Sequence, residues 1–311
     1  MALTYSWWSE SGGPGKTTNC VHTAAAMGRD GYDVLAVDLD NQRGGLTHYM
    51  GYGELTHDDG AVTETTIMDV MFGEATPRDI CVETPHFDLL PTHEDLTNFI
   101  SRLDSSPRRG VDEFRVVRDM LDTVEDDYEI IVIDCKATLD ELVDNSLFAT
   151  QNVMVPLELT PKGKASQEGL EATVTAMHDG FSDLGVEIAI AGCVPSRVGQ
   201  ANIFERYREQ HQDDGVPVSP FAVPEHSLLK YTWHHRMDLF SFIVSDETRN
   251  LREYEEHVPL AFKVIGRLMS GDMKYEDAVS IWDEVKDREM GDATPKALLD
   301  EYWDDKQRAG A

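Results

Sequence analysis

The chain has 311 residues, enough for one large α/β domain with an appendage or for two modest domains. No stretch approaches the roughly 18 uninterrupted apolar residues of a membrane span, and the apolar run Met1–Trp8 lacks the basic flank of a signal peptide. Four scattered cysteines without a CxxC pair disfavour a disulfide framework and a zinc site, so we expect a cytoplasmic protein.

Negative charge is the strongest signal in the composition. Asp and Glu number 58 against 27 Lys and Arg, which gives a net charge of −31, and the acidic residues are spread along the whole length. At about 1 M salt the Debye length falls to about 3 Å, which would screen the self-repulsion of such a chain. The pattern resembles that of halophilic archaeal proteins. An acidic protein with a cationic partner is the alternative.

Apolar runs alternate with amphipathic stretches, which is the rhythm of βαβ units. Strands are predicted at Leu3–Trp8, Asp33–Val37, His86–Leu90, Ile130–Ile133, Val153–Pro156 and Val186–Cys193. Helices are predicted between them, for example at Thr18–Arg29, Phe114–Val124 and Ser166–His178. Right-handed crossovers place such helices on both faces of the sheet, so we predict an α/β fold with a doubly wound, mainly parallel sheet.

The texture of the sequence changes after about residue 270. Glu276–Lys286 and Pro295–Lys306 are predicted as two short, highly charged helices separated by a glycine-containing break. The chain is therefore divided into a main domain, 1–270, and a charged helical C-terminal extension, 271–311. The extension either packs on the domain or binds a partner, and the sequence leaves both open.

The segment between the first strand and the first helix predicts a phosphate site. It consists of Ser11, Gly12, Gly13, Pro14, Gly15, Lys16, Thr17 and Thr18. Glycines let backbone amides close round a phosphate, and the helix N-terminus adds the positive end of its dipole. Lys16 would reach the β- and γ-phosphate oxygens, the Thr17 hydroxyl would bind Mg²⁺, and Thr18 would touch the α-phosphate. A glycine turn with an incidental lysine is the alternative.

Two later strands end in acidic residues. Val34–Gln42 carries Asp38 and Asp40, and Tyr128–Cys135 carries Asp134. A carboxylate at the C-terminal end of a parallel strand faces the crevice in which ligands of such folds bind. Asp134 is therefore expected to hold a Mg²⁺-bound water.

These segments resemble the ParA/MinD group of P-loop ATPases, with its KGGxGKT[ST] loop, its DxDPQ block and its Walker B strand. The resemblance covers roughly residues 2–265. Four positions depart from the group's pattern: Ser11 replaces the leading lysine, Asn41 replaces a proline, and Lys136 and Ala137 replace a Pro-Pro dipeptide. Glu10 stands where the usual P-loop begins with glycine.

The resemblance implies an Mg²⁺-dependent ATPase that forms an ATP-dependent homodimer. In this group the second acid of the DxD block, here Asp40, orients the attacking water, and the first, here Asp38, lies near the Mg²⁺ shell. The leading lysine of the group reaches the partner's nucleotide. With Ser11 in its place, either Lys136 or Arg43 supplies the charge, or dimerisation and hydrolysis are altered.

ParA-type members act in plasmid or chromosome segregation, bind DNA non-specifically at the nucleoid and are stimulated by a ParB-like partner. A MinD-like or degenerate nucleotide-gated scaffold and a small-molecule kinase are the alternatives. The tail Leu298–Ala311 is acidic and has no basic face, which disfavours a membrane anchor. The cysteines are not clustered as iron–sulfur relatives require.

One basic and aromatic cluster is the best candidate for contact with DNA. Its members are Arg197, Arg206, Tyr207, Arg208, Lys230, Tyr231, Trp233 and Arg236. An ordinary helix surface is the alternative, and counterion release gives little affinity in molar salt. Pro195–Arg197 is placed where a loop could contact the nucleotide base.

Overall fold

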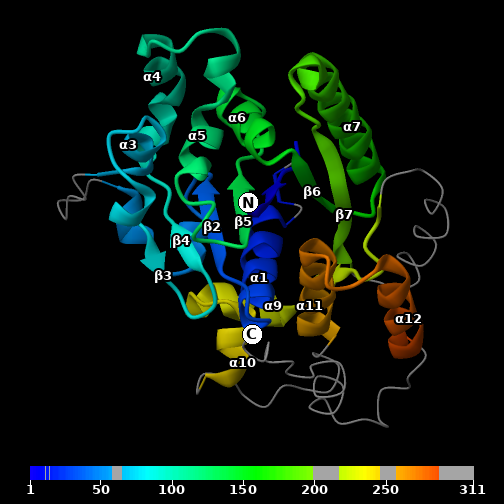
Figure 1. The fold of residues 1–311 in the computed structure, drawn as a ribbon. Helices are drawn as coiled ribbons and strands as arrows, with labels where there is room; N and C mark the ends of the chain where they lie inside the picture. The colour runs from blue at the N-terminus through cyan, green and yellow to red at the C-terminus, as the bar shows by residue number, and fades with distance from the viewer. Residues whose placement is uncertain (11, 14, 58–64, 199–216, 246–256, 287–311) are drawn as a thin grey trace.

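The protein is described by a computed structural model, which covers residues 1–10, 12–13, 15–57, 65–198, 217–245 and 257–286. Within them eight strands form one sheet in the order β3-β4-β2-β5-β1-β6-β7-β8 (Figure 1). Neighbouring strands pair in parallel, apart from β3 with β4. The bounds are β1 Leu3–Trp7, β2 Val34–Leu39, β3 Val82–Glu83, β4 Asp88–Leu90, β5 Ile130–Cys135, β6 Asn152–Leu157, β7 Ala189–Val198 and β8 Val223–Pro224.

The described helices cover both faces of the sheet. Figure 1 shows α3 to α7 on one side and α1, α9, α10 and α11 on the other. The helices are α1 Lys16–Arg29, α2 Leu46–Tyr49, α3 Ile67–Met71, α4 Phe99–Ser105, α5 Val116–Asp122, α6 Glu141–Thr150, α7 Pro161–Phe181, α9 Ser227–His235, α10 Leu239–Val244, α11 His257–Ser270 and α12 Tyr275–Lys286. This is the predicted doubly wound fold, with its site expected at the carboxyl ends of the strands.

The central strands are apolar at nearly every position because both of their faces are covered. All residues of β2 and β5 are buried. Along β5, Ile131 and Ile133 pack in the core layer under α3 to α7, whereas Ile130 and Val132 pack in the layer under α1 and α11. This alternation explains why continuous apolar runs, rather than alternating ones, mark these strands.

Two adjacent tryptophans precede the phosphate loop, and they point to opposite faces of the sheet. Trp7 packs in the layer that contains α1, and Trp8 packs in the layer that contains α3 to α7. Both side chains are fully buried. The strand that leads into the loop is therefore anchored in both layers.

Helix α12 packs on the domain. Ala278 is fully buried, and the ring of Trp282 lies 5.2 Å from that of Phe221, edge to face. The helix predicted at Glu276–Lys286 is confirmed. Its apolar face packs on the domain, so this part of the extension takes the first of the two arrangements that the sequence left open. The helix predicted at Pro295–Lys306 and the tail Leu298–Ala311 lie outside the described residues.

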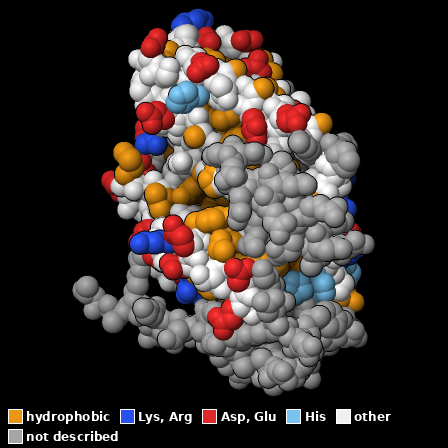
Figure 2. Space-filling model, turned by 90° about the vertical axis from the view of Figure 1, so that its right-hand side faces the viewer, with side chains coloured by type: hydrophobic (Ala, Val, Ile, Leu, Met, Phe, Trp, Pro, Cys, Tyr) orange, Lys and Arg blue, Asp and Glu red, His pale blue; other side chains and the backbone are white. Residues whose placement is uncertain are grey.

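The six predicted strands all exist, but one is displaced. Strand β7 covers Ala189–Val198 rather than Val186–Cys193, and the two-residue strands β3 and β8 were not predicted. None of the described helices is both long and apolar enough to cross a membrane. Figure 2 shows acidic side chains scattered over the face that carries α7 and α12, as the spread of Asp and Glu in the sequence suggests.

Candidate functional site

The loop between β1 and α1 has the backbone of a phosphate-binding turn. Gly15 forms the N-cap of α1 with φ +106°, a conformation that glycine adopts without strain, and Gly13 has φ +92°. Lys16, Thr17 and Thr18 form the first turn of α1, where free amides and the helix dipole attract an anion. Gly12 and Gly13 are exposed, while Ser11 and Pro14 lie outside the described residues.

Lys16 is buried among acidic side chains. Only 7% of its surface is exposed. Burial lowers the pKa of its ammonium group, and the charges of Asp134 and Asp40 oppose that shift. The structure thus brings together the lysine and two of the acids that the sequence placed at this edge.

Asp38 is fully buried, and its carboxylate is occupied by neighbouring groups. Its Oδ2 accepts hydrogen bonds from the Thr47 amide at 2.7 Å and the Thr47 hydroxyl at 2.6 Å, and its Oδ1 accepts one from the Asp40 amide at 3.0 Å. Burial raises its pKa to about 7 despite these bonds. Asp38 therefore fixes the segment from Asp40 to α2 against the end of β2.

Asp134 is equally buried, but among the described residues its carboxylate lacks the hydrogen bonds that Asp38 accepts. Neither carboxylate oxygen has a hydrogen-bond partner in the described part of the chain, although the Thr17 hydroxyl is near enough to lower the pKa. Burial is the main reason that the pKa of Asp134 lies well above its ordinary value, and the charge of Asp38 adds to it. A buried acceptor left in this state costs about 1–3 kcal/mol or more, which a bound cation or its water would offset.

The donor set beside Asp134 fits Mg²⁺. Among the described residues no three His, Cys, Asp or Glu side chains form a metal cage. Mg²⁺ does not need one, because it usually binds one or two protein oxygens together with waters and phosphate oxygens. The Thr17 hydroxyl and the Asp134 carboxylate are such oxygens.

Asp40 lies at the outer side of this group, next to a second lysine. Burial raises its pKa, while the bond from the Gln42 amide and the charges of Lys16 and Lys136 lower it. Lys136 follows β5 directly and forms an ion pair with Asp140, the residue that caps α6. Arg43 is exposed, and its charge reaches His48.

A pocket of about 310 Å³ adjoins the phosphate loop. Gly13, Gly15 and Thr18 form one wall, and the end of β7 and helix α9 form the others. Tyr49 and Trp233 meet edge to face at 4.7 Å in its lining. An apolar and aromatic pocket beside a phosphate site has the character of a base-binding site. Ser196 and Arg197 line it, but Pro195–Arg197 is not the loop that the sequence predicted, because these residues lie at the end of β7.

Three residues of this region were not found from the sequence. Asn19 joins the phosphate loop to β7, Thr47 holds Asp38, and Tyr49 joins α2 to α1 and α9. The contacts of Asn19 and Tyr49 join distant segments, and Thr47 reaches Asp38 across a loop of nine positions, so no local pattern marks these residues. The position of Asn19 four residues after Gly15, on the loop side of α1, was the one available signal.

The described members of the basic cluster do not form a free patch. Arg197 and Lys230 both face Glu225, at 3.9 and 3.6 Å. Arg236 lies over the Trp233 ring and donates to the His48 carbonyl. These contacts belong to the pocket mouth and to helix packing. Arg206, Tyr207 and Arg208 lie outside the described residues.

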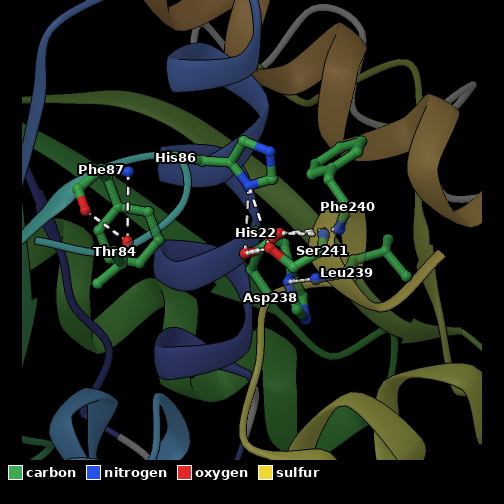
Figure 3. Close-up of polar contacts among 8 residues, drawn as sticks. All are labelled: His22, Thr84, His86, Phe87, Asp238, Leu239, Phe240 and Ser241. Carbon is green, nitrogen blue, oxygen red and sulfur yellow. Dashed lines mark hydrogen bonds and ion pairs between the residues drawn. The ribbon is translucent and has the colours of Figure 1, made fainter. Parts of the chain in front are cut away.

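A second polar cluster contains His, Asp and Ser side chains but does not have the geometry of a catalytic triad (Figure 3). Asp238 and Ser241 both face the same ring nitrogen of His86, Nδ1, at 3.2 and 3.4 Å. A triad needs the acid and the nucleophile on different ring nitrogens. Burial raises the pKa of Asp238, but bonds from His86 and Ser241 lower it more, and the carboxylate caps α10.

Comparison with known proteins agrees with this geometry. A protein-family model described as an AAA domain, AAA_31, matches residues 5–183. An uncharacterised protein of Pseudomonas putida is 34% identical over 195 residues, which cover 62% of this chain and 68% of that protein. The chromosome partitioning protein ParA of Caulobacter vibrioides is 32% identical over 154 residues, 48% of this chain and 54% of ParA.

Among solved structures, the ATP complex of the D38A variant of McdA from Cyanothece superposes with a TM-score of 0.67 at 18% identity. The match covers 88% of this chain and 98% of McdA, and it shows a shared fold. The family match spans more than half of the chain and includes the loop, both acidic strand ends and Lys16. The chain therefore belongs to the AAA_31 family of AAA domains, as a P-loop protein of the ParA/MinD type.

Proposed function

We propose that the chain binds ATP with Mg²⁺ at the start of α1 and hydrolyses it slowly, as a nucleotide-dependent homodimer switch in plasmid or chromosome partition. The observation that carries this proposal is the convergence of Lys16, Asp40 and Asp134, with both oxygens of the buried Asp134 lacking a described donor. Similarity to a chromosome partitioning protein, ParA, supports a role in partition, and the ATP bound in the McdA structure supports ATP as the ligand.

Each group would have a distinct role. Phosphoryl transfer to water requires positioning and positive charge more than covalent help. Lys16 and the amides of the loop would bind the β- and γ-phosphates, and Thr17 with Asp134 would hold Mg²⁺ and its water. When bound, Mg²⁺ neutralises negative charge on the phosphate oxygens. Asp40 would position the attacking water. Asp38, which accepts a hydrogen bond from the Asp40 amide, would hold Asp40 in place near the metal.

Lys136 is our candidate for the charge that Ser11 does not supply. Its charge already acts on Asp40, and Asp140 holds it at the carboxyl end of β5 within the same chain. A charge at this place would act on the γ-phosphate without a partner's lysine. Arg43 is the less favoured candidate because it is exposed and its charge acts on His48.

The test measures ATP binding and phosphate release in concentrated KCl with Mg²⁺. Lys16→Ala should weaken ATP binding by about 100-fold, because it removes the buried ammonium group from the phosphates. Lys136→Ala should bind ATP within a few-fold of the parent and lose about 10- to 100-fold in turnover. Lys274→Ala, which changes an exposed lysine in the connection between α11 and α12, is the control. Failure of the parent protein to bind nucleotide would refute the proposal.

Ser11 favours one other function, a nucleotide-gated scaffold that binds ATP and positions a cell structure with little hydrolysis. Binding without measurable phosphate release, with DNA and a partner protein present, would support the scaffold. Stimulated release would support the partition switch. In the switch, a ParB-like protein would be the activator, and DNA contact would have to rely on hydrogen bonds and shape because charge is screened at high salt.

A further inference from the structure

The end of β7 is bonded to the phosphate loop at two places. Asn19 Nδ2 donates to the Gly15 carbonyl and to Ser196 Oγ, each at 2.9 Å. Arg197 Nη1 donates to the Gly13 carbonyl at 3.1 Å, across 184 positions of sequence. The loop thus has a wall made by residues at the carboxyl end of β7, the strand two places from β1 in the sheet.

The direction of the Gly13 carbonyl matters for phosphate binding by this loop. The peptide that it belongs to leads into Pro14, whose nitrogen carries no hydrogen, so this peptide offers a carbonyl and no donor. Gly13 has φ +92°, and a glycine can turn its peptide over at low cost. A carbonyl turned inward would repel the phosphate. If the carbonyl is held away from the phosphate, the remaining amides of the loop can bind the phosphate oxygens.

Arg197 holds that oxygen toward the end of β7. Its guanidinium also faces Glu158 at 3.3 Å and Glu225 at 3.9 Å, which fixes it beside the loop. Its backbone has φ +58°, a left-handed conformation that is uncommon for a residue other than glycine. Strain of this kind is often kept where a side chain must be aimed at a functional site. The side chain is half exposed, so the ion pairs alone would contribute little.

We propose that Arg197 is a positioning residue of the phosphate site: by donating to the Gly13 carbonyl it keeps the loop in its phosphate-binding shape. It sets affinity for nucleotides that carry a β-phosphate, and it does so within one chain. The inference rests on the proposed nucleotide function and adds a residue that the sequence had assigned to contact with the base or DNA.

The test compares Arg197→Ala, Arg197→Gly and Arg197→Lys by calorimetric titration of ADP and ATP with Mg²⁺. Arg197→Gly guards against misfolding, since glycine accepts φ +58° without strain. Loss of a charge-assisted hydrogen bond should weaken ADP and ATP equally, by about 10-fold, in both truncations. Arg197→Lys should restore most of this affinity, because one donor is enough to reach the carbonyl. Arg78→Ala, which changes an arginine paired with Asp127 away from the loop, should bind like the parent.

The outcomes separate the two proposals. If the parent binds nucleotide and both truncations bind it equally well, the role of Arg197 is refuted and the proposed function stands. Weakening of ATP alone would place Arg197 on the γ-phosphate and would also refute the inference, as would a lysine variant as weak as the truncations. If the parent binds neither nucleotide, the proposed function itself fails.

Discussion

Asp38 and Asp134 are two buried carboxylates of one site that differ in the number of hydrogen bonds they accept. They lie opposite each other on paired strands, at matching positions of the β2 and β5 register. Asp38 accepts three hydrogen bonds, whereas the oxygens of Asp134 accept none from the described residues. The first is therefore suited to hold the protein together, and the second is suited to interact with something that binds.

Asp134→Asn should change stability and binding in opposite directions. Burial raises the pKa of Asp134, so the folded state holds its proton more tightly than the unfolded state, and stability is lost as pH rises through the folded pKa. Without nucleotide, the asparagine variant should melt above the parent at pH 8. Its nucleotide affinity should no longer increase when Mg²⁺ replaces EDTA. Asp127→Asn, at an exposed ion pair, is the control, and an unchanged Mg²⁺ response in Asp134→Asn would contradict the assignment.

His22 should make the fold sensitive to mild acid. It lies inside α1, fully buried, where Nδ1 accepts from the Leu239 amide at 3.2 Å and Nε2 meets the Tyr49 hydroxyl at 2.9 Å. Burial lowers its pKa from 6.5 to about 4, so below pH 6.5 the unfolded state binds a proton that the folded state excludes. Stability is then complete above pH 6.5 and falls as pH drops toward 4, by up to about 3 kcal/mol.

Urea denaturation at pH values from 7.5 to 4.5 would measure the free energy of unfolding of the parent and of His22→Gln. The parent should lose more stability than the variant over this range, since glutamine does not titrate. Parallel curves would mean that acid sensitivity arises elsewhere.

At the scale of elements, helix α1 is held unusually close to the chain before β4. A Cβ added at Gly28 would lie 1.6 Å from the His86 carbonyl oxygen, which is backbone and cannot move aside. The contact seats α1, with Lys16 and His22 on it, against the sheet. His86 is in turn tied to α10 through Asp238 (Figure 3).

Gly28→Ala should therefore destabilise the protein strongly, by about 3 kcal/mol or more, although alanine is the better helix former. Gly180→Ala is the matched control. Gly180 lies in α7, a Cβ there meets nothing within 4 Å, and the substitution should stabilise by up to about 1 kcal/mol. Thermal melts of the two variants should move in opposite directions, and similar shifts would contradict the close approach.

How far the sequence predicted the elements depended on whether each is defined by local or distant contacts. Strands β2 and β5 are buried at every position, so their apolar runs are visible in the chain. Lys16, Asp40 and Asp134 were predicted from strand ends and a glycine loop. The start of β7 was predicted too early because Val186 and Ile188 are apolar although they precede the strand. Two-residue strands such as β3 and β8 exist only through their partners. The bond from Arg197 to the Gly13 carbonyl and the contacts of Tyr49 span more than 100 positions of sequence, so no local pattern predicts them.

At the scale of the whole molecule, the net charge of −31 should make stability depend on salt. Repulsion among surface carboxylates destabilises the compact state, and raising KCl from about 0.1 M to about 1 M shortens the Debye length from about 10 Å to about 3 Å. The melting temperature should rise over this range. A melting temperature that is flat or falls in KCl would contradict the expectation.

Trp7, the last residue of β1, and Trp8, which follows it, give the chain an internal reporter on each side of its sheet. Trp7 and Trp8 are consecutive, fully buried and separated by the sheet, so a phenylalanine substitution at either one leaves an indole in one core layer immediately ahead of the phosphate loop. Because Trp233, Trp282 and Trp303 also fluoresce, the signal of each layer is the difference between the parent and the variant that lacks its indole, followed during unfolding. If one layer unfolds first, its curve would shift before the other. Coincident curves would show that the sheet and the helices on both of its faces unfold as one cooperative unit.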